Sequence, residues 1–304
     1  MGGTSVPPNA PLLACPRQLP YLPYPPYLPY RKFMLPLHDV RVVTIALNAP
    51  GPVAAARLRE AGAAVTKVEP PGGDPLEGYC AGWYRELHDG LTIRRIDLKS
   101  AGGQAQIQEL LVPADLLLAS QRPSALKRLR LDANTVLSSD SRLNHLRCLN
   151  IVGELGAPET PGHDLTYLAK AGLLGREIPR SLFADVLAGE HAFATALLLL
   201  RQPPGSSAQV GLYDTLAPLV GARTHGLTGP GNMLGGALPA YGVYDTLDGR
   251  IAVAALETHF HTRLYEELSL TAGADLTAIF RTRSSSEWER WAATRDLPLT
   301  VVVD

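Results

Sequence analysis

Residues 161–185 bring together three side chains that can carry proton-transfer chemistry. A Pro-Gly turn at 161–162 precedes His163 and Asp164, and Asp185 follows 22 positions after His163. Each group lies at the expected start of a helix, where backbone N–H groups and the helix dipole favour negative charge. A histidine and a carboxyl group on opposite sides of one carbon atom could exchange its proton.

The same residues also fit a structural role. Aspartate is among the preferred N-cap residues, and spacing alone favours capping for both Asp164 and Asp185. A histidine that precedes such a cap is more often a surface residue than a base. The rest of the sequence is therefore needed to choose between the catalytic and the capping interpretation.

The composition indicates a globular protein without a general affinity for polyanions. The 304 residues are 46% hydrophobic and 19% charged, with a formal net charge of −1, so we expect a full core and no nucleic-acid partner. The longest apolar run, 192–200, predicts a buried helix and no membrane partner. Cysteines 15, 80 and 148 lack metal-ligand spacing. We expect reduced thiols, a cytoplasmic protein and no metal site.

The first 33 residues differ from the rest of the chain. Residues 19–30 repeat proline and tyrosine without helical or strand periodicity, which predicts an extended, polyproline-like or disordered segment. It lacks the basic start and apolar core of a secretory signal, and Met34 lies just before the first regular segment. We prefer an upstream misreading of the start codon to a ligand for a proline-recognising domain.

From residue 40 the pattern predicts a doubly wound α/β fold. Strand-length apolar runs alternate with predicted helices, which implies right-handed crossovers and a parallel, Rossmann-like sheet. The strands are expected at 40–47, 65–69, 93–97, 115–119, 147–152 and 209–212, and the helices at 53–61, 102–111 and from 213. Ligands bind at the carboxyl ends of such strands, where Asn48, Lys99 and residues 70–74 and 121–123 fall.

That edge carries cations that could bind a nucleotide with several phosphates. They are Lys67, Arg94, Arg95, Lys99, Arg122, Lys127 and Arg128. An ordinary solvated face is the competing interpretation, and the near-zero net charge favours it for most of them. The first strand is not followed by Gly-x-Gly-x-x-Gly, and the chain has no Walker-type Gly-Lys-Ser/Thr, which disfavours nicotinamide-dinucleotide and P-loop binding.

The pattern changes after the large domain, which we place at 34–225. Residues 226–240 are glycine-rich and predict a linker or a mobile loop. Two strands at 241–246 and 250–255 flank an Asp-Gly hairpin signal, and Glu257 precedes an amphipathic helix that reaches Leu268. With further helices at 276–280 and 285–293, residues 241–304 form a predicted small domain.

The chain resembles the class III CoA transferases (CaiB/BaiF), a family that shares its fold with α-methylacyl-CoA racemase. The resemblance runs from residue 37 to the end. It rests on residues 49–52, 62–75, 96–99, 114–115, 122–123, 162–164, 184–185, 241–244 and 248–249. The Val-Glu-Pro-Pro-Gly-Gly-Asp-Pro run at 68–75 is quite specific, and the matches follow the family's order.

The resemblance implies an acyl-CoA substrate, with the CoA nucleotide on the large domain and the acyl end in a cleft against the small one. In the transferase branch, an aspartate at the position of Asp164 takes the acyl group as a mixed anhydride. The racemase-like branch has Gly-His-Asp. There the histidine, here His163, and a later aspartate, here Asp185, form an acid/base pair, and a glutamate similar in position to Glu257 supports the histidine.

We assign contacts with the CoA moiety to three residues of the ligand edge, Pro70, Lys99 and Arg122. No cofactor beyond this moiety is expected. Three features depart from the family pattern. The connection from His163 to Asp185 is shorter than in the racemases, and the residues around Arg-Pro differ at 120–121 and 124. The family's terminal segment, which returns to the large domain and interlocks two subunits, has no counterpart before residue 304, so we expect a truncated small domain.

The chemistry agrees with the racemase-like assignment. Removal of the proton α to a thioester creates an enolate, so the site needs a base on one face, an acid on the other and donors toward the oxyanion. A histidine has a reference pKa of about 6.5. Asp185 needs a raised pKa, which burial beside Phe183 and Leu187 could provide.

We rank three hypotheses. The first is a racemase or epimerase of 2-methyl-branched or similarly α-substituted acyl-CoA thioesters, working by 1,1-proton transfer through an enolate. The second is a CoA transferase with Asp164 as nucleophile, and the third is a catalytically silent CoA-binding protein. A homodimer is expected in each case, with the interlocking of its subunits left open.

Overall fold

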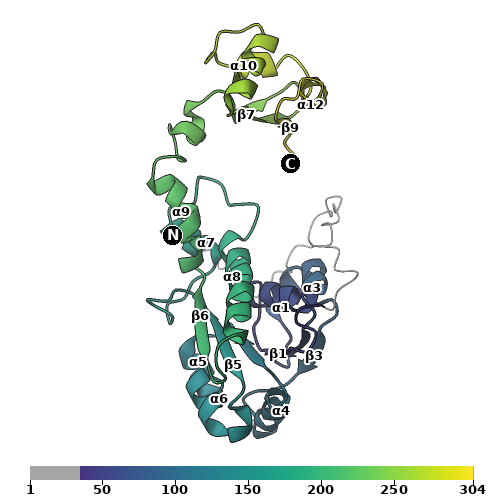
Figure 1. Cartoon of the computed structure of the whole chain (residues 1–304), viewed down its shortest axis with the longest axis vertical. Coiled ribbons are helices and arrows are strands. Elements are labelled where there is room, and N and C mark those ends of the chain that lie inside the picture. The colour runs from purple at the N-terminus through teal and green to yellow at the C-terminus, as the bar shows by residue number, and fades with distance from the viewer. Residues whose placement is uncertain (1–34, 304) are drawn as a thin grey trace, which may run out of the picture. The chain divides into compact units, whose positions relative to one another are not determined.

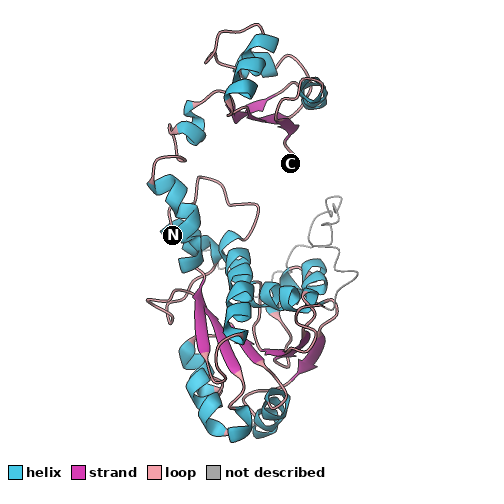
Figure 2. Ribbon diagram, viewed as in Figure 1, coloured by secondary structure: helices cyan, strands magenta, loops and turns pink. Residues whose placement is uncertain are grey.

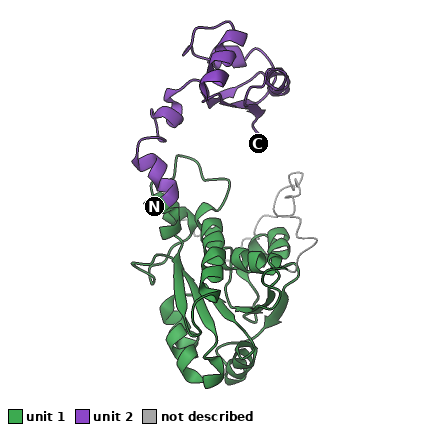
Figure 3. Cartoon of the chain, viewed as in Figure 1, with its two compact units in different colours: residues 1–217 green, residues 218–304 purple. Residues whose placement is uncertain are grey.

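The computed structural model describes residues 35–303 and groups the chain into two compact units. Unit 1 ends at Ala217 and unit 2 begins at Pro218, as the two colours of Figure 3 show. The proline- and tyrosine-rich extension at 1–33 lies outside the described residues. The sequence predicts that the large domain ends at residue 225. In the structure unit 1 ends earlier, at the start of α9 (Ala217–Thr224).

A six-stranded parallel sheet forms the centre of unit 1 (Figures 1 and 2). Its strands are β1 (Arg41–Thr44), β2 (Ala64–Glu69), β3 (Thr92–Arg95), β4 (Leu116–Ala119), β5 (Arg147–Val152) and β6 (Ser207–Gly211). Their order is β3-β2-β1-β4-β5-β6, and every neighbouring pair is parallel. This confirms the doubly wound prediction. The order reverses between β1 and β4, where such sheets bind ligands.

Helices cover both faces of the sheet because successive strand residues point to opposite sides. Val42 packs with Leu58 and Ala188 on one face, whereas Val43 packs with Ile107 on the other. The first face is covered by α1 (Pro50–Glu60) and α8 (Phe183–Leu200), and the second by α4 (Ala101–Leu111), α5 (Pro123–Arg128) and α6 (Ala133–Ser139). Burial on both sides explains why the central strands are continuous apolar runs.

A glycine allows α8 to lie close against α1. A Cβ added at Gly189 would lie 2.6 Å from the Cβ of Val53 and 2.8 Å from the carbonyl oxygen of Pro50. Arg57 of α1 also donates from Nε to Oε1 of Glu190 at 2.7 Å. Because Asp185 lies one turn before Gly189 on the same rigid helix, this contact also positions Asp185.

α8 begins well before the apolar run at 192–200 that predicted it. By length and composition alone it is long and apolar enough to cross a bilayer, with a third of it buried in unit 1. Ala184, Ala188, Ala192 and Ala196 are completely buried and belong to the apolar core between α8 and the sheet. In the described structure α8 is thus a core helix of unit 1.

Several short helices of unit 1 were not predicted. They are α2 (Pro75–Tyr79), α3 (Ala81–His88), α5 and α6. α2 and α5 each begin with a proline that follows a polar residue, a pattern typical of helix starts. Their lengths of five and six residues leave too little periodicity to recognise. The same proline effect places the start of α1 at Pro50, three residues before the predicted one.

Unit 2 is built around a three-stranded antiparallel sheet. Its elements are α9 from Pro218 onward, η3 (Met233–Ala237), β7 (Tyr241–Asp245), β8 (Arg250–Ala254), α10 (Thr258–Glu267), α11 (Thr277–Phe280), α12 (Ser285–Ala293) and β9 (Leu299–Val301). The predicted hairpin is present as β7 and β8. Ile251 and Val253 pack with Leu264, Phe280 and Trp288 in a core separate from that of unit 1.

Candidate active site

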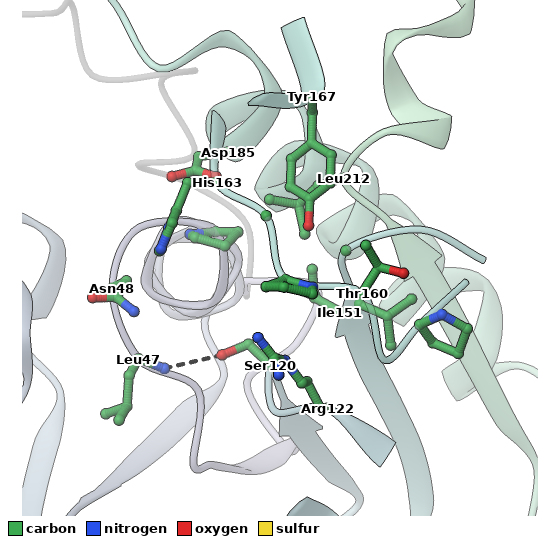
Figure 4. Close-up of a pocket in the computed structure, with 16 residues that line it drawn as sticks. Leu47, Asn48, Ser120, Arg122, Ile151, Thr160, His163, Tyr167, Asp185 and Leu212 are labelled. Carbon is green, nitrogen blue, oxygen red and sulfur yellow. Dashed lines mark hydrogen bonds between the residues drawn. The ribbon is translucent and has the colours of Figure 1, made fainter. Parts of the chain in front are cut away.

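A cavity of about 260 Å³ lies in unit 1 at the point where the strand order reverses (Figure 4). Segments that follow β1, β4 and β5 form its wall, together with the starts of α7 (Asp164–Lys170) and α8. The polar lining residues are Asn48, Ser120, Arg122, Thr160, His163, Tyr167 and Asp185. Three predicted site residues, His163, Asp185 and Arg122, thus line one cavity despite the short connection between the first two.

His163 is the N-cap residue of α7, and its backbone is held in place by Thr166. The N–H of His163 donates to the Thr166 Oγ1 at 3.0 Å, and the Thr166 hydroxyl donates to the His163 carbonyl oxygen at 2.8 Å. The histidine is exposed and its side chain lines the cavity. A fixed backbone and an accessible imidazole are what a proton carrier requires.

Asp164 caps a helix other than its own. The side chain is only 5% exposed, and its Oδ1 accepts the backbone N–H groups of Ala184 at 2.6 Å and Asp185 at 3.2 Å. Both donors belong to the first turn of α8, which would otherwise leave them without partners. The capping interpretation therefore holds for Asp164, and it links the two halves of the candidate site directly.

Asp185 lies in the first turn of α8 and is partly buried. Burial, followed by the negative charge of Asp164, raises the pKa of the Asp185 carboxyl group to about 6. This value lies close to the ordinary pKa of a histidine, about 6.5. A carboxyl group with such a pKa can both give and take a proton near neutral pH.

Tyr167 is a lining residue that the sequence analysis missed. Its hydroxyl occupies a slot between two glycines, because a Cβ at Gly153 would lie 2.2 Å from it and a Cβ at Gly162 2.4 Å from it. Burial and then the charge of Asp185 raise the pKa of the Tyr167 hydroxyl. Tyr167 lies on α7, four residues after the N-cap His163, and both residues line the cavity.

The predicted CoA contacts fall at different places. Arg122 lines the first cavity, whereas Lys99 lines a second one of about 660 Å³ together with Arg128 and Arg130. Helix α5 starts directly after Arg122 and includes Arg128. Pro70 lies exposed in the turn after β2, outside the lining of both cavities.

Lys67 does not belong to the possible phosphate-binding cations, which corrects the sequence-based expectation. It is completely buried, and its ammonium group donates to Oδ2 of Asp74 and to Nε2 of His88. Within the described part of the chain, Glu69, Asp74 and His88 place ligand atoms within 4.8 Å of one another, as a metal ion would need. The Lys67 ammonium brings positive charge to this group.

Glu257, the predicted support for His163, is the exposed N-cap residue of α10 in unit 2. Its carbonyl oxygen accepts the N–H of His261 at 2.8 Å. The predicted support of His163 by Glu257 stays a prediction.

Comparison with known proteins identifies relatives of two activities. Residues 37–304 match the family described as CoA-transferase family III. The chain is 30% identical over 256 residues to the alpha-methylacyl-CoA racemase of Mus musculus, covering 77% of this chain and 65% of that protein. It is 28% identical over 267 residues to the succinyl-CoA–D-citramalate CoA-transferase of Chloroflexus aurantiacus. That match also covers 77% of this chain and 65% of the relative. The chain thus spans about 65% of the length of these relatives.

Solved structures support the same fold. The crystal structure of a hypothetical protein, Rv3272, from Mycobacterium tuberculosis superposes with a TM-score of 0.73 at 22% identity. The match covers 88% of this chain and 86% of that chain.

Proposed function

The chain belongs to CoA-transferase family III, and from that premise we propose that it racemises or epimerises acyl-CoA thioesters that carry a 2-methyl or similar substituent at the α-carbon. One observation carries the proposal: His163 and Asp185 line a single cavity, and the pKa of Asp185 is raised to about 6. The racemase among the relatives supports the same choice.

In this proposal the two side chains exchange one proton across the α-carbon. His163, as the neutral base, takes the α-proton, and the electron pair of the broken C–H bond forms an enolate with its charge on the thioester oxygen. Asp185, protonated, then gives its proton to the opposite face of the same carbon. The positive ends of α7 and α8 lie at the cavity and favour the negative charge of the enolate.

After this turnover the histidine is charged and the aspartate ionised, which is the starting state for the reverse direction. Because burial raises the pKa of the Asp185 carboxyl group to about 6, both its protonated and its ionised form are accessible near neutral pH. Tyr167 lines the same cavity, and its hydroxyl is held between Gly153 and Gly162.

The CoA moiety would extend from the first cavity along α5. Arg122 stands at the start of this helix, and Lys99, Arg128 and Arg130 line the second cavity beside it. Guanidinium and ammonium groups pair well with phosphate oxygens. We therefore propose that the second cavity takes the phosphorylated nucleotide end and the first the acyl end.

A CoA-transferase activity is the alternative, because one relative is named as such an enzyme. It would need the Asp164 carboxylate to attack the acyl carbon. Asp164 is almost completely buried, and its Oδ1 already accepts two N–H groups of α8. These contacts favour proton transfer over nucleophilic attack. A family member that binds CoA without catalysis is the third possibility.

One set of measurements separates the three. Incubation of a 2-methylacyl-CoA in deuterated water should place deuterium at the α-carbon, as followed by mass spectrometry. Trapping with hydroxylamine in the presence of a carboxylic acid acceptor should leave Asp164 unmodified. An Asp164 adduct would instead support the transferase, and thioester binding without exchange or transfer would support the silent protein.

The homodimer and the role of Glu257 belong to the same proposal. Sedimentation of the full chain should give twice the monomer mass of 32.6 kDa. Glu257→Gln should lower the exchange rate and shift its pH profile, because a glutamate beside His163 stabilises the charged imidazole. An unchanged profile would remove Glu257 from the site.

A further inference from the structure

A buried group of ionisable residues lies behind the wall of the active-site cavity. We define it as the Lys67 cluster, made of Lys67, Glu69, Asp74, Tyr84 and His88. Lys67 and Glu69 are 0% exposed, Asp74 3% and His88 5%. None of these side chains lines the cavity, so the proposed reaction does not use them. Buried charges are costly unless each is paired, which calls for an explanation of their presence.

The Lys67 ammonium lies among three acceptors. It donates to Oδ2 of Asp74 and to Nε2 of His88, and Oε1 of Glu69 lies 3.5 Å away. His88 can accept because its other ring nitrogen, Nδ1, donates to the Tyr84 carbonyl oxygen at 2.6 Å, which sets the neutral tautomer. Tyr84 in turn donates its hydroxyl to Oε1 of Glu69 at 2.8 Å.

Asp74 connects this cluster to the cavity wall through its second oxygen. Oδ1 accepts the backbone N–H of Asn48 at 3.0 Å and that of Leu76, in the first turn of α2, also at 3.0 Å. Asn48 lines the cavity and has a φ of 64°, in the left-handed region that few residues other than glycine adopt. On the other side of the turn, the Leu47 N–H donates to the Ser120 hydroxyl at 3.1 Å.

We propose that Asp74 is a positioning residue of the active-site cavity. Held in one orientation by the buried ammonium of Lys67, it fixes the Asn48 turn in its left-handed conformation and thereby keeps this part of the cavity wall in place. Lys67 supplies the cation that aligns Asp74. Asp74 acts on the cavity of the proposed function. Its effect on kinetics rests on that function, whereas its effect on the Asn48 amide does not.

Hydrogen exchange of the Asn48 amide tests the proposal without any substrate. Although Asn48 is exposed, its amide in the wild-type protein should be protected, because a charge-assisted hydrogen bond holds it. Exchange at the rate of an unstructured amide would overturn the proposal before any variant is made.

Variants then test the role of Asp74. Asp74→Ala should speed exchange of the Asn48 amide about tenfold relative to amides of β4 and β5, the effect of losing one hydrogen bond of about 1.4 kcal/mol. Asp74→Asn keeps an acceptor oxygen and should restore most of the protection. Asp132→Ala is the matched control, because Asp132 caps α6 by accepting the Thr135 N–H, away from the cavity. It should leave the Asn48 amide unchanged.

Equal acceleration of all unit 1 amides in Asp74→Ala, or the same local effect in Asp132→Ala, would reduce Asp74 to a general stabiliser and overturn the proposal. Should Asp74→Ala fail to fold, Asp74→Asn and the wild-type measurement still decide it. Under the proposed function, Asp74→Ala should raise the KM for a 2-methylacyl-CoA more than it lowers kcat. A wild-type protein without α-proton exchange would refute the proposed function and leave the amide measurements intact.

Discussion

Two groups of ionisable side chains lie at the same edge of the unit 1 sheet in opposite surroundings. His163 is exposed at a cavity, and burial raises the pKa of Asp185 there toward that of a histidine. In the Lys67 cluster, the ammonium of Lys67 faces three acceptors and water is excluded. In the proposed function the first group exchanges protons with the substrate, whereas the second group is buried and held by hydrogen bonds.

Under the proposed function, this difference would let one edge of a sheet carry both reactive and fixed groups. A proton carrier needs an accessible atom and a pKa near the working pH, whereas a positioning group needs partners for every donor. Asp164 and Asp74 have the same structural task. Each carboxylate accepts backbone N–H groups of a segment that lines the cavity.

The largest expected effect follows from the loss of His163, the proposed base. His163→Ala should slow α-proton exchange of a 2-methylacyl-CoA by about 100- to 10,000-fold, the usual contribution of general acid/base catalysis. His191→Ala, which changes an exposed histidine on α8, is the control and should retain the wild-type rate. Deuterium incorporation measures both. Undiminished exchange in His163→Ala would end its assignment as the base.

Removal of Lys67 should lower the stability more than removal of an exposed charged side chain. Lys67→Met leaves the carboxylates of Glu69 and Asp74 buried without their ammonium partner, and should lower the free energy of unfolding by about 3–5 kcal/mol. Lys170→Met removes an exposed ammonium group that donates to Oε1 of Glu154 at 2.7 Å. This change should lower the free energy of unfolding far less. Urea titration measures both, and similar losses would contradict the contrast.

Asp185 should reduce stability at neutral pH. Its folded pKa, about 6, is above the ordinary 3.8, so the folded state holds the proton more tightly. Stability from this group is complete below pH 4 and is lost as the pH rises through 6. Asp185→Asn should therefore stabilise the protein at pH 7 by up to about 3 kcal/mol and change it little at pH 4. An equal effect at both pH values would count against the raised pKa.

Gly189 allows one region to be disturbed without the other. The added Cβ of Gly189→Ala would meet Val53 and push α8 away from α1, which should cost about 1–3 kcal/mol of stability. The shift also moves Asp185 and should slow exchange of the α-proton. The Asn48 amide should keep its protection, because Asp74 lies on a different segment. Loss of that protection would show that the two regions are coupled.

His88 should give the smallest effect, with a pH dependence opposite to that of Asp185. Burial, followed by the charge of Lys67, lowers the pKa of His88 in the folded state, against smaller opposing effects of Asp74 and Glu69. Below about pH 6.5 the unfolded chain therefore binds more protons, and stability falls as the pH falls.

Unfolding of the wild type and of His88→Gln between pH 7.5 and 5 should reveal this contribution as a difference that shrinks on acidification. The amide of glutamine can still accept from Lys67 but does not titrate. A constant difference would show that His88 does not change its protonation in this range.

Much of the fold could be predicted, because its determinants are local. The apolar runs of β1, β4 and β5 are buried on both sides, and parallel neighbours require crossover connections, which helices supply. The short helices α2, α3, α5 and α6 were missed, since caps and packing rather than periodicity define them. Lys67 was expected among the cations of the ligand edge, because the sequence of β2 does not show that its one lysine faces the interior.

The sequence by itself determined the residue types that can move a proton, the family, and the six strands of the parallel sheet, because these depend on side-chain chemistry and short-range periodicity. Only the tertiary structure decided that Asp164 caps α8, that Tyr167 lies between two glycines, and that Asp74 holds Asn48. Those contacts join segments distant along the chain, and their donors and acceptors find one another only once the sheet has brought its loops to one edge.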